Sequence, residues 1–379
     1  MVEAVRRGRS LREVARRFQV SHSTVLVWLG RAGDERLSRV DWSDRPRGPH
    51  RPANRTPAAT EELVVAVRRE LARESALGEF GARAIRETLC QRGREPLPSV
   101  RTIGRILDRR GALDGRQRRR HVAPPRGWHL PDLARRTVES DSFDVVEDLT
   151  IRGGIDVNVL TGISLFGSLA GAWPKRRISA ENVVEELISH WRAVGLPGYA
   201  QFDNDTRFQG PHQHRDVVGR VTRLCLSLGV TPVFVPPQET GFQAAIEHFN
   251  GRWQRAVWRR FRHRSRAELV RRSDAFVNAW RGRQAERIES APRRRRFPKG
   301  WRFDPAAALA GRIVYLRRLD EAGRAHLLGR RFDVDRAWAH RLVRAEMDVT
   351  AERLRFYALR RREPDRQPLL KEVHHALRK

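Results

Sequence analysis

The segment Tyr199-Ala-Gln-Phe-Asp203-Asn204-Asp205-Thr206-Arg207-Phe208 lies near the middle of the 379-residue chain and decides how its largest domain is interpreted. A short apolar run of strand type ends there abruptly at an acid. A second acid, Glu247, follows 44 positions later, and Asp141 lies 62 positions upstream. Separated carboxylates in a very basic chain indicate a divalent cation site, because Mg²⁺ prefers oxygen ligands.

The chain as a whole is strongly basic. It contains 76 Lys and Arg residues against 45 Asp and Glu, which gives a net charge of +31 and an isoelectric point near 11.6. A charge of this size repels itself in the folded state unless a polyanion neutralises it. Nucleic acid is therefore the expected partner. A membrane surface is less favoured, because the basic residues are spread along the chain and are not concentrated in one amphipathic helix.

Cysteine content and hydropathy exclude other classes of protein. Cys90 and Cys225 are the only cysteines, and without a CxxC pair they favour neither a disulfide framework nor a cysteine zinc site. No apolar stretch approaches the roughly 20 residues of a membrane span. The N-terminus also lacks the apolar region of a secretory signal. We expect a cytoplasmic protein with no membrane partner.

Basic, proline-containing stretches predict the domain boundaries, because proline fixes φ and removes a hydrogen-bond donor. The predicted divisions are a helix-turn-helix domain at 1–38, a basic linker at 39–58, a second helix-turn-helix-like domain at 59–113, a basic linker at 114–134, a mixed α/β domain at 135–290, and a strand-rich C-terminal region with a helical tail at 291–379.

The first domain has the pattern of a helix-turn-helix. Apolar residues recur at helical spacing from Leu11 to Phe18, and after a short break Ser21 is a favourable N-cap for a second helix. In this motif the N-terminal end of the second helix enters the major groove. We therefore predict that Ser21, His22 and Ser23 contact DNA. An ordinary small helical hairpin is the alternative.

The second domain repeats this logic. Helices are predicted over 61–75 and 82–91, and a third begins after Pro98 with Ser99 as its cap. The exposed face of the third helix carries Arg101 and Arg105, which we predict to bind DNA phosphates. A solvated helical spacer is the alternative.

The order of elements in the third domain predicts its fold. Alternating and apolar residues over 138–173, with a hairpin turn at Gly153-Gly154, indicate two or three antiparallel strands. A helix capped by Ser179, a strand over 199–202, a helix over 217–228, a strand over 230–235 and a helix from Gln243 follow. This is the order of an RNase H-like α/β domain with a mixed sheet, in which strand ends deliver side chains to one edge.

The predicted site lies at that edge. Asp203 ends a strand, and Glu247 lies one turn into the last helix of the domain. The other side of this helix carries Arg252, Arg255 and Arg259, which we predict to bind DNA. Two Mg²⁺ ions about 3.5–4 Å apart can activate a nucleophile and stabilise the leaving oxygen in phosphoryl displacement. Without a cation, clustered acids repel one another and their pKa values rise.

These motifs resemble the DDE transposase/retroviral integrase superfamily, and in particular bacterial insertion-sequence transposases with an integrase-type catalytic core. The segment from Asp203 to Phe208 is similar to the family's Asp-Asn-Gly-Ser/Thr-x-Phe strand end. The segment from Pro236 to Asn250 resembles its proline-rich loop, glycine and Glu-x-x-Asn helix, and Val138-Glu139-Ser140-Asp141 matches its first-strand acid. The likeness covers 138–260. Asp205 departs from it by replacing the usual glycine, and the spacing between the second and third acids is longer than usual.

The resemblance implies an activity and a set of site residues. Asp141, Asp203 and Glu247 would be the catalytic residues and would bind two Mg²⁺ ions, with Mn²⁺ as a substitute. The enzyme would bind the ends of its element in double-stranded DNA, free a 3′-hydroxyl there, and transfer that strand into target DNA as a homodimer or higher multimer. Residues 300–360 resemble the small β-barrel that follows the core in related transposases.

Two questions stay open at the level of sequence. Asp144, Glu147 and Asp148 compete with Asp141 as the first acid, because strand alternation does not choose between the two faces. The function has alternatives as well: a DNA-binding regulator derived from a transposase that has lost catalysis, or an RNase H-type nuclease acting on hybrids. Two helix-turn-helix units disfavour the nuclease.

Overall fold

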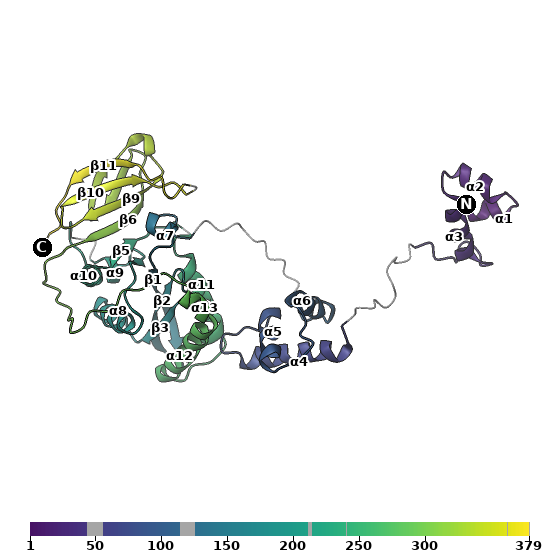
Figure 1. Ribbon diagram of the computed structural model, residues 1–379, viewed down its shortest axis with the longest axis horizontal. Coiled ribbons are helices and arrows are strands. Elements are labelled where there is room, and N and C mark those ends of the chain that lie inside the picture. Colours follow the sequence, from purple (N-terminus) through teal and green to yellow (C-terminus); the bar gives the residue numbers. More distant parts are fainter. Residues whose placement is uncertain (44–55, 114–125, 211–213, 240, 362, 379) are drawn as a thin grey trace. The chain divides into compact units, whose positions relative to one another are not determined.

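The computed structural model describes residues 1–43, 56–113, 126–210, 214–239, 241–361 and 363–378 (Figure 1). The chain divides into two compact units, Met1–Glu61 and Glu62–Lys379. The expected linkers lie largely outside the described residues, over 44–55 and 114–125. None of the helices in the described ranges has the length and apolar character needed to cross a membrane.

The first unit contains the predicted pair of helices and one more. α1 (Val2–Arg6), α2 (Leu11–Arg17) and α3 (His22–Ala32) surround the fully buried side chains of Val14 and Val25. Ser21 caps α3 by accepting a hydrogen bond from the Thr24 amide at 3.1 Å, as predicted. Val40 packs against α1 and α3, so the folded part continues past the expected boundary at 38.

Three further helices form the predicted second helical segment. These are α4 (Ala58–Glu74), α5 (Ala82–Gln91) and α6 (Val100–Arg109). Ser99 caps α6 through the Thr102 amide at 3.1 Å. Their common core consists of Val64, Val67, Ile85, Leu89, Ile103, Ile106 and Leu107. The helices predicted from periodicity are confirmed to within a few residues at each end.

The α/β domain has the predicted order of elements. β1 (Ser140–Ile151), β2 (Ile155–Ser164) and β3 (Ala170–Lys175) form an antiparallel meander. Gly153 and Gly154 make the first turn with φ values of +91° and +71°, a region that glycine enters without strain. The next elements are α8 (Ala180–Val194), β4 (Tyr199–Phe202), α9 (Thr206–Gln209), α10 (Arg220–Ser227), β5 (Thr231–Phe234) and α11 (Ala244–Trp253). β4 pairs in parallel with both β1 and β5, which gives the expected mixed sheet.

Helices cover both faces of this sheet. Trp191 of α8 and Phe143 of β1 belong to one hydrophobic core. Phe249 of α11 packs on the other face in a second core with Val146 of β1. The helices α12 (Arg266–Arg283) and α13 (Ala285–Glu289) follow α11 (Figure 1). α12 contributes Phe276 to the second core. The strand β1 is therefore buried on both sides.

The C-terminal region differs from the prediction of a separate small β-barrel with a helical tail. Its strands β6 (Arg312–Arg318), β9 (Leu342–Asp348), β10 (Arg353–Ala358) and β11 (Leu369–His374) continue the central sheet. The nine strands run in the order β11-β10-β9-β6-β5-β4-β1-β2-β3. β7 (Arg324–Leu327) and β8 (Arg330–Asp333) form a separate two-stranded ribbon. Residues 369–374, expected in the helical tail, are the edge strand β11.

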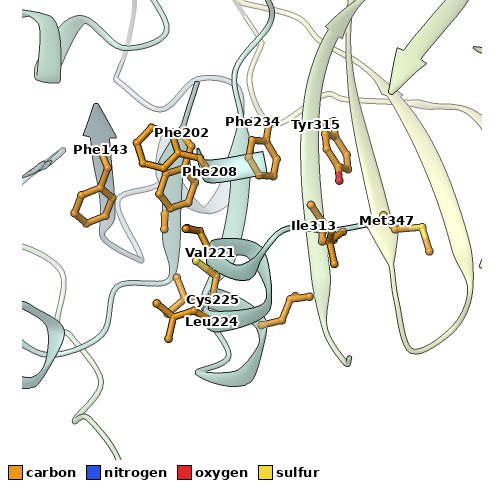
Figure 2. Packing of buried hydrophobic residues seen from close by; sticks show 14 of the residues in the cluster. Phe143, Phe202, Phe208, Val221, Leu224, Cys225, Phe234, Ile313, Tyr315 and Met347 are labelled. Atoms are coloured by element: carbon orange, nitrogen blue, oxygen red, sulfur yellow. The ribbon is translucent and has the colours of Figure 1, made fainter. Parts of the chain in front are cut away.

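A row of aromatic rings explains why the sheet continues from β5 into β6. Phe143, Phe202, Phe234 and Tyr315 lie on neighbouring strands of the sheet, and successive ring centroids are 5.7, 6.0 and 5.3 Å apart (Figure 2). β6 pairs in parallel with β5 through Val314 and Tyr315. Aromatic contacts at these spacings add to the stabilisation from apolar burial. One hydrophobic core thus spans the α/β domain and the C-terminal strands.

The end of the expected second linker is also folded. Residues 131–134 form the short helix α7 (Pro131–Ala134). Trp128, Leu130 and Leu133 are buried in a cluster with residues of the central sheet. The part of this linker that the structure describes therefore belongs to the second unit.

Candidate active site

The two candidate first acids of β1 lie on opposite faces of the sheet. Asp141 and Asp144 are separated by three positions, and side chains alternate between faces along a strand. Asp141 shares the face of Phe143, which packs against α8. Asp144 shares the face of Val146, which packs against α11, the helix that carries Glu247. Only Asp144 therefore faces the helix of the predicted third acid.

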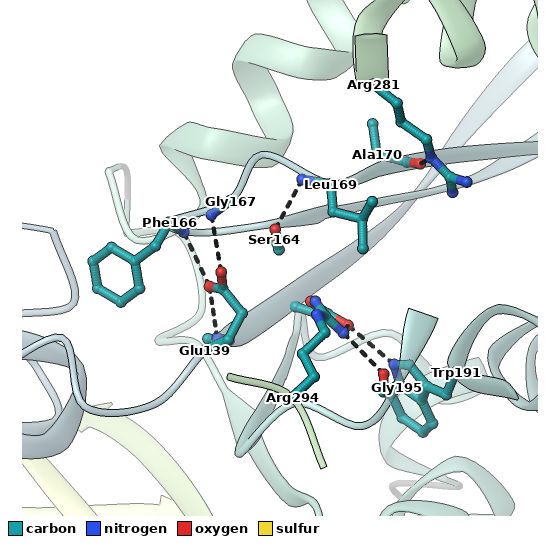
Figure 3. A network of polar contacts seen from close by, with 12 residues as sticks. Glu139, Ser164, Phe166, Gly167, Leu169, Ala170, Trp191, Gly195, Arg281 and Arg294 are labelled. Atoms are coloured by element: carbon teal, nitrogen blue, oxygen red, sulfur yellow. Dashed lines mark hydrogen bonds and ion pairs between the residues drawn. The ribbon is translucent and has the colours of Figure 1, made fainter. Parts of the chain in front are cut away.

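Asp141 is buried in a structural ion pair. Its side chain accepts a hydrogen bond from Trp191 Nε1 at 3.0 Å and pairs with the guanidinium of Arg294, whose Nη1 donates to Oδ2 at 3.0 Å. Arg294 Nη1 also donates to the Gly195 carbonyl at 3.0 Å (Figure 3). Asp141 is only 1% exposed. The structure therefore separates Asp141, the predicted first acid, from the other two acids. Trp191 and Arg294 occupy its carboxylate, which leaves it no access to a ligand.

Glu139, two positions earlier, has a similar structural role. Its carboxylate accepts hydrogen bonds from the amides of Phe166 and Gly167 at 3.0 and 2.9 Å (Figure 3). Burial raises the pKa of Glu139, and these bonds oppose that rise. Glu139, just before β1, thus binds the neighbouring turn, and Asp141, within β1, binds Arg294.

Asp144 contacts the helix that carries Glu247. Its Oδ2 accepts a hydrogen bond from Asn250 Nδ2 of α11 at 2.8 Å. Burial raises the pKa of Asp144 to about 6, and the negative charges of Asp203 and Glu247 contribute to the rise. The hydrogen bond to Asn250 sets the Asp144 side chain against α11, the helix that carries Glu247.

Asp203 follows directly after β4 and is partly buried. Its Oδ1 accepts a hydrogen bond from the Asp205 amide at 3.0 Å. Burial raises the pKa of Asp203, and the charges of Asp205 and Glu147 raise it further. Glu247 is exposed in the first turn of α11. The strand end and the closing helix place these two acids as the sequence pattern predicted.

Arg207 is a cation within this acidic group that the sequence interpretation did not assign. Its Nε donates to Asp205 Oδ1 at 2.8 Å, and its Nη1 donates to Glu147 Oε1 at 2.7 Å. These hydrogen bonds raise the pKa of Arg207, so the side chain stays charged. Arg207 offsets the two extra acids beside Asp203. Its position two residues after Asp205 in the sequence could have identified Arg207 as a partner of that acid.

The donor set fits a hard divalent cation in its chemistry, because it consists of carboxylate oxygens. Within the described ranges, however, no three Asp, Glu, His or Cys side chains lie close enough together to hold a metal ion. The carboxylates would have to move toward one another to share a cation, and the exposed Glu247 has the greatest freedom to do so.

Some solved structures show a distant similarity to this chain. No family model matches the chain. Among solved structures, a chain of the simian T-cell lymphotropic virus intasome in complex with PP2A regulatory subunit B56 gamma is 12% identical, over 70% of this chain and 88% of that chain, with a TM-score of 0.35. The HTLV-2 integrase catalytic core domain in complex with magnesium is 11% identical, over 42% and 87% of the two chains, with a TM-score of 0.27.

The catalytic core domain of BIV integrase is 14% identical, over 37% of this chain and 80% of that chain, also with a TM-score of 0.27. The structural neighbours are thus retroviral integrases and their catalytic cores. At these identities and TM-scores the similarity carries no argument about the reaction.

The predicted DNA-contacting residues of the helical segments are accessible. Ser21, His22 and Ser23 are exposed at the N-terminal end of α3, although the Ser21 hydroxyl is also engaged as the helix cap. Arg101 and Arg105 are exposed on α6. Their exposure is compatible with binding to DNA.

The three arginines predicted to bind DNA beyond Glu247 differ in their surroundings. Arg252 lies in α11, whereas Arg255 lies in the π-helical turn Gln254–Trp258 after it and Arg259 follows that turn. Arg255 and Arg259 are exposed, and their bonds are local, to the Gly251 carbonyl at 3.1 Å and to Gln254 at 3.4 Å. Arg252 is half-buried and pairs with Glu79. Binding of a phosphate to Arg252 would have to displace this carboxylate, whereas Arg255 and Arg259 need to break only local bonds.

Proposed function

We propose that this protein is a DNA transposase of the DDE type, which cleaves the 3′ ends of an element and joins them to target DNA. The observation that carries the proposal is the 2.8 Å hydrogen bond from Asn250 Nδ2 to Asp144 Oδ2, which sets the Asp144 side chain against the helix that carries Glu247. Asp144, Asp203 and Glu247 come from a strand, a strand end and a helix that are far apart in the sequence. Asp144 replaces Asp141 as the proposed first acid, because Asp141 is committed to Arg294.

In this proposal Asp144, Asp203 and Glu247 would hold two Mg²⁺ ions, with Mn²⁺ as a substitute. When bound, such ions activate the attacking hydroxyl and stabilise the leaving oxygen. Asn250 would hold the Asp144 carboxylate in place through its hydrogen bond. Arg207 would keep Asp205 and Glu147 paired, so that these acids do not compete for the cations.

The remaining parts would bind the substrate. The N-terminal end of α3, with Ser21, His22 and Ser23, would recognise the ends of the element in duplex DNA. Arg101 and Arg105 of α6, together with Arg252, Arg255 and Arg259, would bind phosphates. Joining two ends requires two active sites, so the protein would act as a homodimer or higher multimer on DNA. The net charge of +31 supports a polyanionic partner.

Strand transfer in vitro tests the proposal. Inverted repeats in the DNA that flanks the gene supply candidate ends, which are offered as duplexes with a free 3′-hydroxyl together with a plasmid target and Mg²⁺ or Mn²⁺. Asp203→Asn should reduce strand transfer by at least about 100-fold, as expected when one group that stabilises a transition state is removed. DNA binding should persist in this variant.

Asp148→Asn is the matched control for that experiment. Asp148 is an exposed acid of β1, the strand that carries Asp144, and has a φ of +56°, a conformation that asparagine tolerates well. This variant should retain full activity. Equal activity of Asp203→Asn and the unmodified protein would contradict the proposed chemistry.

A DNA-binding regulator without catalysis is the second candidate function. The observation that favours it is that no three potential ligands in the described part of the chain are close enough to hold a metal ion. A regulator would bind the same ends, would show no metal-dependent joining under any condition, and would be indifferent to Asp203→Asn. Parallel binding and strand-transfer assays therefore separate the two functions.

A further inference from the structure

A buried arginine of the C-terminal region reaches the end of the strand that carries Asp203. Arg317 lies on β6 and is 5% exposed. Its Nη1 donates to the carbonyl of Val235, just after β5, at 3.2 Å, and its Nη2 donates to Asn204 Oδ1 at 2.8 Å. Its Nε donates to the His326 carbonyl at 3.1 Å. One guanidinium therefore joins β6 to the ends of β4 and β5.

Asn204 completes this connection. Its Nδ2 donates to the Val235 carbonyl at 2.7 Å, so the amide and the guanidinium of Arg317 share the same acceptor. Asn204 is the residue after Asp203, whose Oδ1 accepts the Asp205 amide. The Asn204 side chain is thus held by Val235 and Arg317. The Asp203 carboxylate is held by the Asp205 amide.

Burial of the charged Arg317 side chain is energetically unfavourable unless hydrogen bonds compensate for the loss of hydration. Arginine is rarely fully buried without a carboxylate partner, because removing a charge from water is unfavourable. Among the described residues no carboxylate forms an ion pair with Arg317, and its contacts are neutral oxygens and the ring of Tyr315. Burial lowers the pKa of Arg317 to about 10, so the group remains charged at neutral pH. Its five N–H donors hold several acceptors in a fixed geometry, which an apolar side chain could not do.

We propose that Arg317 is a positioning residue for Asp203, and that strand β6 is in this way part of the active site. Arg317 holds the Asn204 amide, which fixes the backbone from which the Asp203 carboxylate projects. This inference rests on the proposed function for its catalytic consequence. Its structural part, an ordered Asp203–Asp205 segment that depends on Arg317, is independent of catalysis.

The test compares three variants. Arg317→Met removes the donors and keeps much of the apolar volume, and Arg317→Lys keeps the charge without the fork of donors. Arg344→Met is the matched control, since Arg344 is another buried arginine of the same sheet, on β9. Its guanidinium bonds Gln367 at 2.7 Å and pairs with Glu346, without contact to Asn204. Both methionine variants should lose comparable stability, and only one should affect the site.

The first measurement is hydrogen exchange of the Asp205 amide in the metal-free protein, because that amide donates to the Asp203 carboxylate. Arg317→Met should increase its exchange rate by about 10-fold or more relative to Arg344→Met, and Arg317→Lys should lie between them. The second measurement is the Mg²⁺ concentration for half-maximal strand transfer, which should rise about 10- to 100-fold in Arg317→Met, as when a partner that orients a metal ligand is removed.

Equal exchange at Asp205 in Arg317→Met and Arg344→Met would overturn the inference. If Arg317→Met does not fold, Asn204→Ala provides the same comparison with Arg317 retained, and unchanged exchange there would equally overturn it. Failure of the proposed function gives a different pattern. In that case the unmodified protein shows no strand transfer, while the difference in exchange between the two methionine variants persists.

Discussion

Asn250 donates a hydrogen bond from Nδ2 to Oδ2 of Asp144 over 2.8 Å, although 106 positions separate the two residues. The bond joins α11 to β1 and shows which face of β1 lies against this helix. Asp141, on the opposite face, is held by Trp191 and Arg294. The two acids should therefore respond to substitution in opposite ways.

Substitution of each acid by asparagine separates catalysis from stability. Asp144→Asn should abolish strand transfer with no loss of stability, because a repelled carboxylate is replaced by a neutral group that still accepts the Asn250 bond. Asp141→Asn should lower the free energy of unfolding by about 3–5 kcal/mol, because it leaves the Arg294 charge buried without its partner. Urea unfolding and strand-transfer rates measure the two effects. Loss of activity in a stable Asp141→Asn variant would restore Asp141 as the first acid.

The pH dependence of stability should reveal the raised pKa of Asp144. A carboxyl whose pKa is about 6 in the folded state and about 3.8 when unfolded binds its proton more tightly in the folded state. It stabilises folding below about pH 4, and this contribution is lost as the pH rises through 6. Each pKa unit corresponds to about 1.4 kcal/mol, so the effect is on the order of 3 kcal/mol.

The difference between the unmodified protein and Asp144→Asn isolates this contribution from those of other acids. In metal-free urea unfolding at pH 8, Asp144→Asn should be the more stable protein, and the difference should disappear below about pH 4. Mg²⁺ should reduce the difference at pH 8, since a bound cation favours the ionised carboxylate. A difference that is independent of pH would show that Asp144 has an ordinary pKa.

Removal of Arg207 should lower the stability of the metal-free protein and increase the stabilisation that Mg²⁺ provides. Arg207→Gln releases Asp205 and Glu147 from their ion pairs, which should cost roughly 1 kcal/mol for these partly exposed groups. The melting temperature without metal should fall by about 2 °C. Stabilisation by Mg²⁺ should increase, because the local potential becomes more negative. Thermal melts with and without Mg²⁺ measure both effects, and Arg220→Gln, at a surface pair with Glu181 away from the proposed acids, is the control.

The first unit offers a test that distinguishes helix stability from DNA recognition. Ser21→Ala and Ser10→Ala each remove an N-cap hydrogen bond and should each cost about 1 kcal/mol of stability. His22→Ala should leave stability unchanged and weaken binding to the element ends about 10-fold, as expected for loss of one specific contact. Circular dichroism melts and binding titrations at fixed salt measure these effects. Equal binding by Ser10→Ala and His22→Ala would argue against recognition by α3.

Local signals in the sequence predicted much of the fold. Helix caps such as Ser99 and Ser179 set where helices begin, and the abrupt change from an apolar run to Asp203 set where β4 ends. The choice between Asp141 and Asp144 was not accessible in this way. Both faces of β1 are covered, so its pattern has no polar side that would orient the strand.

The contribution of the C-terminal region was also inaccessible to local reasoning. β6 pairs in parallel with β5 across a sequence separation of about 80 residues. Pairing over such a distance depends on packing of the rings of Phe234 and Tyr315 against each other, which residue periodicity does not reveal. The position of Arg317 could not be predicted for a similar reason, since nothing in the sequence distinguishes this buried arginine from the many exposed ones.

The join between β5 and β6 has a consequence for the order of events during synthesis. The three proposed acids have all been translated once Glu247 leaves the ribosome, yet the strand that carries Arg317 begins some 65 residues later. Until then β5 is an open edge and the Asn204 amide lacks its guanidinium partner. In a nascent chain the segment after β4 would thus gain its full set of hydrogen bonds only after β6 has emerged, well after the last of the proposed acids.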